Sequence, residues 1–164
     1  MSSGSFNRYF EIITWPNYLS IVGDMGSLTF SRIEDMFNFF RSESANNPRV
    51  NPSYWHEKLV SSDHNEPPKE YKPEIFLAIV KKELEAWHFE GGCDNETMME
   101  ILETAKYASE SEYEARSWLY ENDGSPITDA WEYTLEEFTD RYKWQLWAIV
   151  HTVIAYDLEK RENK

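Results

Sequence analysis

Residues 10–31, FEIITWPNYLSIVGDMGSLTFS, decide the fold of this chain. The stretch contains three runs rich in β-branched and aromatic residues, which favour extended strands. Pro16 and Asn17 separate the first two runs, and the glycines of GDMG precede the third, where positive φ angles permit a tight reversal. The pattern predicts an antiparallel meander of three strands over residues 9–31, with residues 1–8 as a flexible leader.

The spacing of apolar residues changes to a helical period after the meander, so residues 33–92 are predicted to form helices joined by loops. The first helix is expected over residues 33–41. Asn51 and Pro52 predict the cap and the first residue of a short helix with the sequence SYWHEKLV. A longer helix is expected over residues 73–89, because a proline opens it and two glycines follow it.

Residues 93–140 are predicted to form an acidic helical segment that contains two amphipathic helices, the second over residues 109–121. Their apolar faces comprise Met98, Ile101, Leu102 and Ala105 in the first helix and Ala115, Trp118 and Leu119 in the second. Thr134 and Glu137 match a capping box for the last helix, which we expect to be a core helix over residues 141–160.

The last helix is apolar over much of its circumference and carries two stripes. One stripe comprises Trp144, Trp147, His151 and Ile154, and the other comprises Phe138, Tyr142, Ile149 and Val153. One is expected to fill the core, with His151 in the core or an interface, and the other to pack against further helices or a second copy of the chain. The elements together predict an α+β fold, a single domain over residues 1–164 in which the meander packs against about five helices.

Composition bounds the class of protein. The 164 residues are 41% hydrophobic and 16% aromatic, which is typical of one globular domain with a real core. The only cysteine excludes an internal disulfide, and no apolar run is long enough for a signal peptide or a membrane span. We therefore expect a protein of the cytoplasm.

The net charge of -14 is distributed unevenly along the chain. Residues 93–140 contain fourteen acidic and two basic residues, a net charge of -12, so the remainder of the chain carries only -2. Such a charge repels nucleic acid and acidic membranes and favours basic partners. The basic residues are scattered among acids and form no stripe, which argues against direct binding of nucleic acid.

No motif predicts an active site or a metal site. His56 and His64 are eight residues apart, a separation that matches no compact zinc motif. Cys93 has Asp94 beside it, and that carboxylate would oppose formation of a thiolate. The sequence also lacks a nucleophile elbow and a dinucleotide fingerprint. We therefore expect a protein that is not an enzyme, with no metal and no cofactor; a small hydrolase with an unrecognised site is the weaker alternative.

The acidic helices have two interpretations. Their carboxylates solvate the outer faces of amphipathic helices, or they imitate the phosphates of a nucleic acid. The candidate partner-binding residues of the second interpretation are Glu96, Glu100, Glu103, Glu110, Glu114, Glu121 and Asp123. Two aromatic residues, Tyr54 and Trp55, form a secondary candidate contact.

The stretch FEIITWPNYLSIVGDMGSLTFSRIEDMFNFFR, followed by NPSYWHEKL and EYKPEIF, resembles a family of small accessory proteins encoded by temperate phages and prophages. The resemblance covers roughly residues 9–80, with a looser similarity around TDRYKWQLWAIV in the last helix. It implies expression in a bacterial host cytoplasm and assigns no catalytic residue. Small acidic proteins from that setting often block host defence nucleases, including CRISPR effectors and restriction enzymes.

These observations lead to one functional prediction. We expect a counter-defence protein of the anti-CRISPR or anti-restriction type, which blocks a host protein complex by covering its basic nucleic-acid-binding surface. An acidic phage interaction or assembly protein without mimicry is the alternative. A homodimer is compatible with the second stripe of the last helix.

Overall fold

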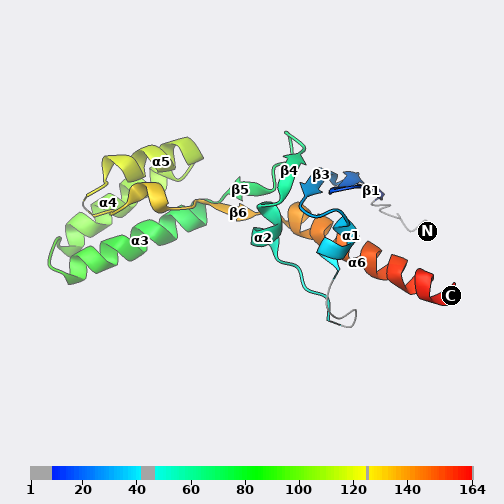
Figure 1. Cartoon of the computed structure of the whole chain (residues 1–164). Coiled ribbons are helices and arrows are strands. Elements are labelled where there is room, and N and C mark those ends of the chain that lie inside the picture. The colour runs from blue at the N-terminus through cyan, green and yellow to red at the C-terminus, as the bar shows by residue number, and fades with distance from the viewer. Residues whose placement is uncertain (1–8, 42–46, 125, 164) are drawn as a thin grey trace, which may run out of the picture. The chain divides into compact units, whose positions relative to one another are not determined.

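The computed structural model describes residues 9–41, 47–124 and 126–163, and the predicted leader at residues 1–8 lies outside this range. The fold is α+β, as predicted (Figure 1). Its contacts divide the chain into two compact units. Unit 1 combines residues 1–69 with residues 138–164, and unit 2 comprises residues 70–137. A single domain was predicted, and the two separate core clusters of the structure were not.

Unit 1 contains the predicted meander. Strands β1 (Phe10–Trp15), β2 (Tyr18–Gly23) and β3 (Gly26–Ser31) pair antiparallel through two tight turns, and β4 (Leu59–Ser62) adds a fourth strand beside β3. The first turn has Asn17 in the left-handed region at φ 72°, and the second begins β3 with Gly26 at φ 83°. The prediction of a three-stranded meander over residues 9–31 is confirmed.

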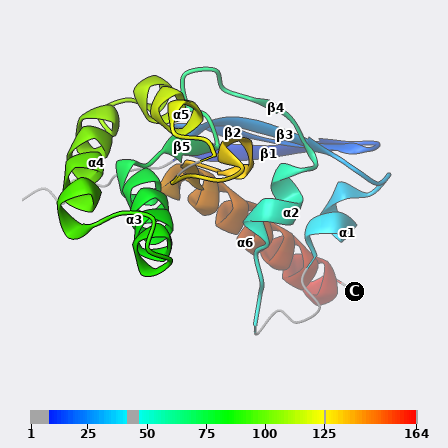
Figure 2. The same ribbon diagram turned by 90° about the vertical axis from the view of Figure 1, so that its left-hand side faces the viewer.

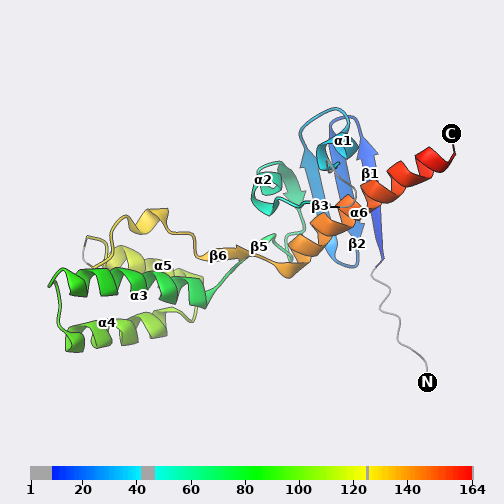
Figure 3. The ribbon, with the colours of Figure 1, turned by 90° about the horizontal axis from the view of Figure 1, so that it is seen from below.

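Helices α1 (Met36–Phe40), α2 (Pro52–His56) and α6 (Asp140–Glu162) contribute to the core of unit 1 (Figure 3). Alternation along the strands directs one set of side chains toward these helices. The fully buried residues of the core include Leu19, Ile21, Leu28, Phe30, Met36, Phe40, Tyr142, Leu146 and Ile149. Of the two predicted stripes of the last helix, the one with Tyr142 and Ile149 fills the core.

The other stripe of α6 is partly exposed. Trp147 is 39% exposed, and its ring lies 5.8 Å from the ring of His151, which is also exposed. The expectation of a core position for His151 is therefore wrong, because α6 turns this side of its surface away from the sheet of unit 1.

Local corrections concern where the helices of unit 1 begin and end. Helix α1 begins at Met36 rather than Ile33, because the carboxylate of Asp35 caps it by accepting the N–H of Asn38 at 3.2 Å. The predicted cap of α2 is confirmed, since Asn51 accepts the N–H of Tyr54 at 3.1 Å. That helix ends at His56, however, and the last two residues predicted to continue it, Leu59 and Val60, begin β4.

The predicted capping box of the last helix is wrong. Thr139 caps α6 by accepting the N–H of Tyr142 at 3.1 Å. Thr134 and Glu137 cannot cap it, because the chain between them is extended: β6 (Glu136–Phe138) pairs with β5 (Lys69–Tyr71) in a two-stranded sheet. The chain passes from unit 1 to unit 2 within β5 and returns within β6.

Unit 2 is helical and has its own core. It contains α3 (Pro73–Phe89), α4 (Asn95–Ala108), α5 (Glu112–Glu121) and the short 3-10 helix η1 (Ala130–Glu132) (Figure 2). Buried residues of the core are Phe76, Val80, Leu84, Ala105, Ala115, Trp118, Leu119, Ile127, Ala130 and Leu135. The predicted start and end of α3 and the two predicted helices of the acidic segment are confirmed.

The turn between α3 and α4 requires glycine. Gly91 has φ 79°, which ends α3 in the left-handed region. A Cβ at Gly92 would lie 2.0 Å from the indole nitrogen of Trp87, so any larger residue there would force this ring to move. The turn thereby lets Trp87 pack at the edge of the core of unit 2.

Candidate functional site

The division into two units separates the charges of the molecule. Unit 2 contains eighteen acidic and five basic residues, a net charge of -13. Unit 1 contains twelve acidic and eleven basic residues, a net charge of -1. The two values account for the total of -14, so nearly all of the excess negative charge belongs to one folded unit.

Helix α4 presents one row of candidate carboxylates. Asp94 caps the helix by accepting the N–H of Thr97 at 2.8 Å, and this hydrogen bond lowers the pKa of Asp94 below its usual value. Ala105 is buried, and Met98, Ile101 and Leu102 pack against the same core. The helical period then turns the opposite face outward. This exposed face carries Glu96, Glu100 and Glu103.

Helix α5 is tied to α4 through its core side. Ser111 caps α5 by accepting the N–H of Glu114 at 3.2 Å. The indole N–H of Trp118 donates to the hydroxyl of Thr104 on α4 at 2.9 Å, and its ring packs edge-on against Phe76 at 5.8 Å. These contacts orient the outer face of α5, where Glu114 and Glu121 are exposed.

The connection between the two helices is also fixed. The hydroxyl of Tyr71 donates to the carbonyl of Ser109 at 3.0 Å, and the hydroxyl of Ser109 donates to the carbonyl of Lys106 at 2.7 Å. Burial raises the pKa of Tyr71 above its usual value, so this phenol remains a hydrogen-bond donor at neutral pH. Glu110 follows directly and is exposed.

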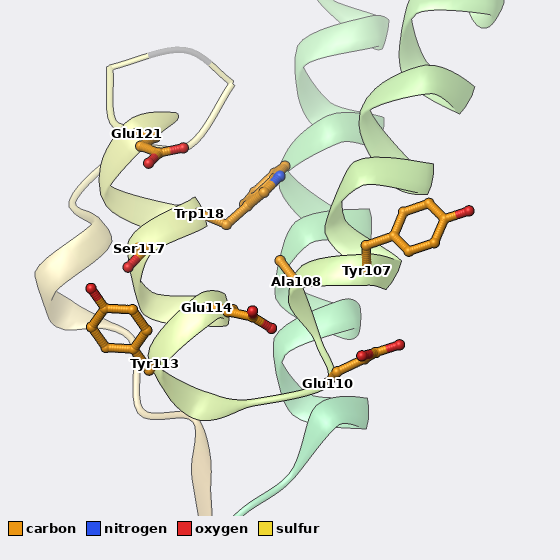
Figure 4. A pocket seen from close by; sticks show the side chains of 8 residues that line it. All are labelled: Tyr107, Ala108, Glu110, Tyr113, Glu114, Ser117, Trp118 and Glu121. Atoms are coloured by element: carbon orange, nitrogen blue, oxygen red, sulfur yellow. The ribbon is translucent and has the colours of Figure 1, made fainter.

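An open groove of about 410 Å³ lies along α5, and we call it the acidic groove. Its lining residues are Tyr107, Ala108, Glu110, Tyr113, Glu114, Ser117, Trp118 and Glu121. Figure 4 shows these side chains on the end of α4, on α5 and on the connection between them. Three of the seven candidate carboxylates thus meet in one groove, together with Tyr107 and Tyr113, whose side chains are 73% and 81% exposed.

The other candidates are placed differently. Glu96, Glu100 and Glu103 are exposed on α4 but do not line the acidic groove. Asp123 is exposed as well, and its carboxylate accepts the backbone N–H of Ala130 at 3.2 Å, which gives it a structural role in the loop after α5.

The secondary candidate pair, Tyr54 and Trp55, lies in unit 1 and is only half exposed. Tyr54 is 41% exposed, with the ammonium group of Lys58 over its ring at 4.9 Å. Trp55 is 7% exposed and packs edge-on against Phe40 in the core. Trp55 is therefore a core residue and not a surface contact, because α2 turns it toward α1.

Within the described ranges, the six candidate glutamates form no ion pair. Four of the five cations of unit 2 bind other carboxylates instead. These pairs are Lys72 with Glu70, Lys81 with Glu85, Lys82 with Glu83, and Arg116 with Glu112. Ion pairs within the described part of unit 2 therefore leave the charges of these six glutamates unneutralised.

Sequence reasoning missed the two tyrosines of the groove. Tyr107 and Tyr113 lie off the apolar stripes of their helices, a position in which a large ring stays exposed, and Tyr113 stands between Glu112 and Glu114. That position was a usable signal. Their meeting in one groove was not predictable, because it depends on how α4 packs against α5.

The residues considered for metal binding or catalysis are not brought together. His56 packs against the rings of Phe138 and Tyr142, while His64 is exposed in a loop. The carbonyl of Cys93 lies 2.8 Å from Nδ1 of His88. Across the residues that the structure describes, no group of three or more His, Cys, Asp or Glu side chains is arranged to hold a metal ion. No helix in those ranges is long and apolar enough to cross a bilayer.

No family model, curated protein or solved structure matches the chain. The resemblance to phage accessory proteins therefore stays a prediction, and so does the function that it implies.

Proposed function

We propose that the protein is a binding protein without enzymatic activity, and that unit 2 covers the basic nucleic-acid-binding surface of a partner. The resemblance to phage accessory proteins suggests the setting, in which the partner is a host defence complex of the CRISPR or restriction type. The observation that carries the proposal is the concentration of charge: -13 on unit 2 against -1 on unit 1, with the candidate glutamates exposed and outside ion pairs in the described ranges.

The acidic groove is suited to the side chains that line nucleic-acid-binding surfaces. A guanidinium group pairs with carboxylates through its planar fork and stacks on aromatic rings. The groove offers both kinds of contact, carboxylates from Glu110, Glu114 and Glu121 and rings from Tyr107 and Tyr113. We therefore expect arginine to bind more tightly than lysine at this position.

Charge spacing supports mimicry only when both helices are used. Carboxylates four residues apart on a helix are separated by about 6 Å along its axis, whereas duplex DNA carries one charge per about 1.7 Å. The row on α4 alone is sparser than a duplex. The groove adds a second set of carboxylates, and a partner with cations along its cleft could contact both.

The free energy of a single exposed ion pair is small, so binding would have to be shared among several of the glutamates. One exposed ion pair contributes about 0.2–1 kcal/mol, so six give about 1–6 kcal/mol in total. The same charges accelerate association with a basic surface, an effect that salt screens. Binding should therefore weaken steeply with ionic strength. Solvation of the helices without any partner is the competing explanation of the same carboxylates, and an interaction or assembly role without mimicry is the competing function.

The test compares two variants of equal charge. One replaces Glu100, Glu103, Glu110 and Glu114 by lysine. The control replaces four exposed glutamates of unit 1, Glu34, Glu57, Glu159 and Glu162, by lysine. Each set adds eight charge units to -14 and leaves a net charge of -6. Binding to an arginine-rich peptide is followed by fluorescence anisotropy, with single-stranded DNA of the same charge as the competitor for the peptide.

The unit 2 variant should lose binding by at least about tenfold, the loss of roughly two to four ion pairs. The unit 1 control should lose about threefold at most through net charge. Equal affinities of the two variants would show that net charge alone matters and would remove the proposed surface. A pull-down from bacterial lysate with wild type and both variants then identifies the partner, which DNA should displace.

A further inference from the structure

Strand β1 is the outer strand of the sheet in unit 1 (Figure 3). In the part of the chain that the structure describes, it pairs only with β2. Its sequence, FEIITW, contains one charged residue, Glu11. Ile13 and Trp15 project from the face of the strand opposite the core and are 49% and 44% exposed. Edge strands of soluble proteins are usually blunted by lysine, proline or a bulge, and β1 contains none of these.

The register shows which backbone groups of β1 face outward. The N–H of Asp24 donates to the carbonyl of Tyr9 at 3.0 Å, so Tyr9 directs its polar groups toward β2. Hydrogen-bonded positions alternate along an antiparallel pair. Glu11, Ile13 and Trp15 therefore face β2 as well. The N–H and C=O groups of Phe10, Ile12 and Thr14 point along the free edge, away from β2.

We propose that β1 pairs antiparallel with β1 of a second copy of the chain, with the twofold axis at Ile12. In this symmetric register every N–H and C=O group on the free edge has a partner. Phe10 pairs with Thr14 of the second copy, and Ile12 pairs with Ile12 of the second copy. Registers centred one residue to either side are worse. A centre at Glu11 places two carboxylates opposite each other, and a centre at Ile13 brings in Pro16, which has no N–H to donate.

Side chains on the outer face complement each other in this register. Glu11 lies opposite Ile13 of the second copy, so the like charges of the two strands stay apart. Tyr9, which is 57% exposed, lies opposite Trp15 of the second copy and gains an aromatic neighbour. The strand is therefore complementary to itself, so a second copy of β1 fits this edge better than an unrelated strand.

The area available makes the dimer weak. An aromatic side chain buries roughly 150–250 Å², so covering the exposed parts of Tyr9, Ile13 and Trp15 removes about 300 Å² per copy. The total of about 600 Å², plus the strand edges, is below the range of about 1,200–2,000 Å² for stable complexes. We expect a dissociation constant on the order of 0.1 mM.

Salt dependence gives the dimer a signature of its own. Each copy carries a net charge of -14, so the copies repel each other until salt screens them. Dimerisation should therefore strengthen with added salt, whereas binding of a basic partner to unit 2 should weaken. Dimerisation through β1 and partner binding through unit 2 can therefore be tested independently of each other.

Sedimentation equilibrium of the full chain, from about 10 to about 500 µM, tests the proposal with two pairs of variants. Ile13→Glu places a carboxylate opposite Glu11 of the second copy, and Ile13→Lys places an ammonium group there. Val60→Glu and Val60→Lys make the same charge changes at an exposed residue of β4, the opposite edge of the sheet, where the side chain is 57% exposed. Circular dichroism checks that all four variants fold.

The proposal expects wild type to dimerise in this range and more strongly at high salt. The lysine variant at position 13 should dimerise about tenfold more tightly than the glutamate variant, because the dimer contains two such cross-strand pairs. The two variants at position 60 should differ by about twofold at most, through net charge alone. A monomer at all concentrations would overturn the proposal. So would equal differences at the two positions, which would place the contact elsewhere, for example on the exposed stripe of α6.

Discussion

Unit 1 and unit 2 are both built around buried aromatic and aliphatic side chains, yet their surfaces diverge. Unit 1 is nearly neutral, and its exposed residues include Tyr9, Ile13 and Trp15 on one strand. Unit 2 carries a net charge of -13, and in the described ranges the exposed glutamates Glu96, Glu100 and Glu103 of α4 and Glu114 and Glu121 of α5 form no ion pair. Solubility alone would not require the negative charge to be concentrated in unit 2. The difference points to separate roles for the two surfaces.

The stability of unit 2 has to come from its core and its caps, because its outer charges repel one another. Like charges four residues apart on a helix destabilise it by a few tenths of a kcal/mol per pair. Trp118 opposes this cost most directly, since it joins α5 to α3 through Phe76 and to α4 through Thr104. Replacing Trp118 should therefore destabilise unit 2 and leave unit 1 unchanged.

The largest expected effect is the loss of that core residue. Trp118→Ala should lower the free energy of unfolding of unit 2 by about 3–5 kcal/mol, through the cavity and the lost ring contacts. Trp118→Phe should lose some stability because the ring is smaller. It should lose about 1 kcal/mol more because the hydrogen bond to Thr104 is absent. Hydrogen exchange read by mass spectrometry during urea unfolding follows each unit separately. Protection should fall in residues 70–137 and be retained in the sheet of unit 1; an equal loss in both would mean that the units unfold as one.

A smaller effect concerns Asp157 of unit 1, which forms an ion pair, unlike the candidate glutamates of unit 2 in the described ranges. The guanidinium of Arg41 donates to both carboxylate oxygens of Asp157, at 2.7 and 2.9 Å, and lowers the pKa of Asp157. A folded-state pKa below the unfolded value of about 3.9 gives stability that is present at neutral pH and is lost as pH falls through the folded pKa. Because both side chains are partly exposed, we expect a contribution of about 0.5–1 kcal/mol.

Asp157→Asn measures this contribution. Urea unfolding should show the variant to be less stable than wild type at pH 7 by that amount, and the difference should shrink as pH falls through the lowered folded-state pKa of Asp157. Glu159→Gln is the matched control, because Glu159 is an exposed acid on the same helix that forms no ion pair within the described ranges. A difference between Asp157→Asn and wild type that persists unchanged at low pH would contradict the role of the ion pair.

Local patterns in the sequence predicted much of this fold. The meander is encoded by the alternation and turn residues of residues 10–31, and the cap of α2 by Asn51 and Pro52. Pairings between distant residues were missed. The first two residues of β4, Leu59 and Val60, belong to a predicted helix, but in the structure β4 pairs with β3, which lies about thirty residues earlier in the chain. The pairing of β5 with β6 joins residues more than sixty positions apart, and the boundaries between the two units fall within these strands.

In the candidate site, too, the sequence predicted local features but not contacts between different elements. The 3.6-residue period correctly placed the glutamates of α4 and α5 outside the core, since that period is a property of each helix alone. Which carboxylates share a groove depends on the packing of α5 on α4 through Trp118 and Thr104. Burial of Trp55 likewise depends on Phe40, which is distant in the sequence.

The central claim is that the charge of unit 2 forms a binding surface for a basic partner. Its most direct test is a titration of the ¹⁵N-labelled protein with an arginine-rich peptide, followed by NMR. The account predicts saturable shift changes in α4, in α5 and at Glu110, with the largest changes around Tyr107 and Tyr113, and none in the sheet of unit 1. Changes spread evenly over both units, or centred on unit 1, would contradict it.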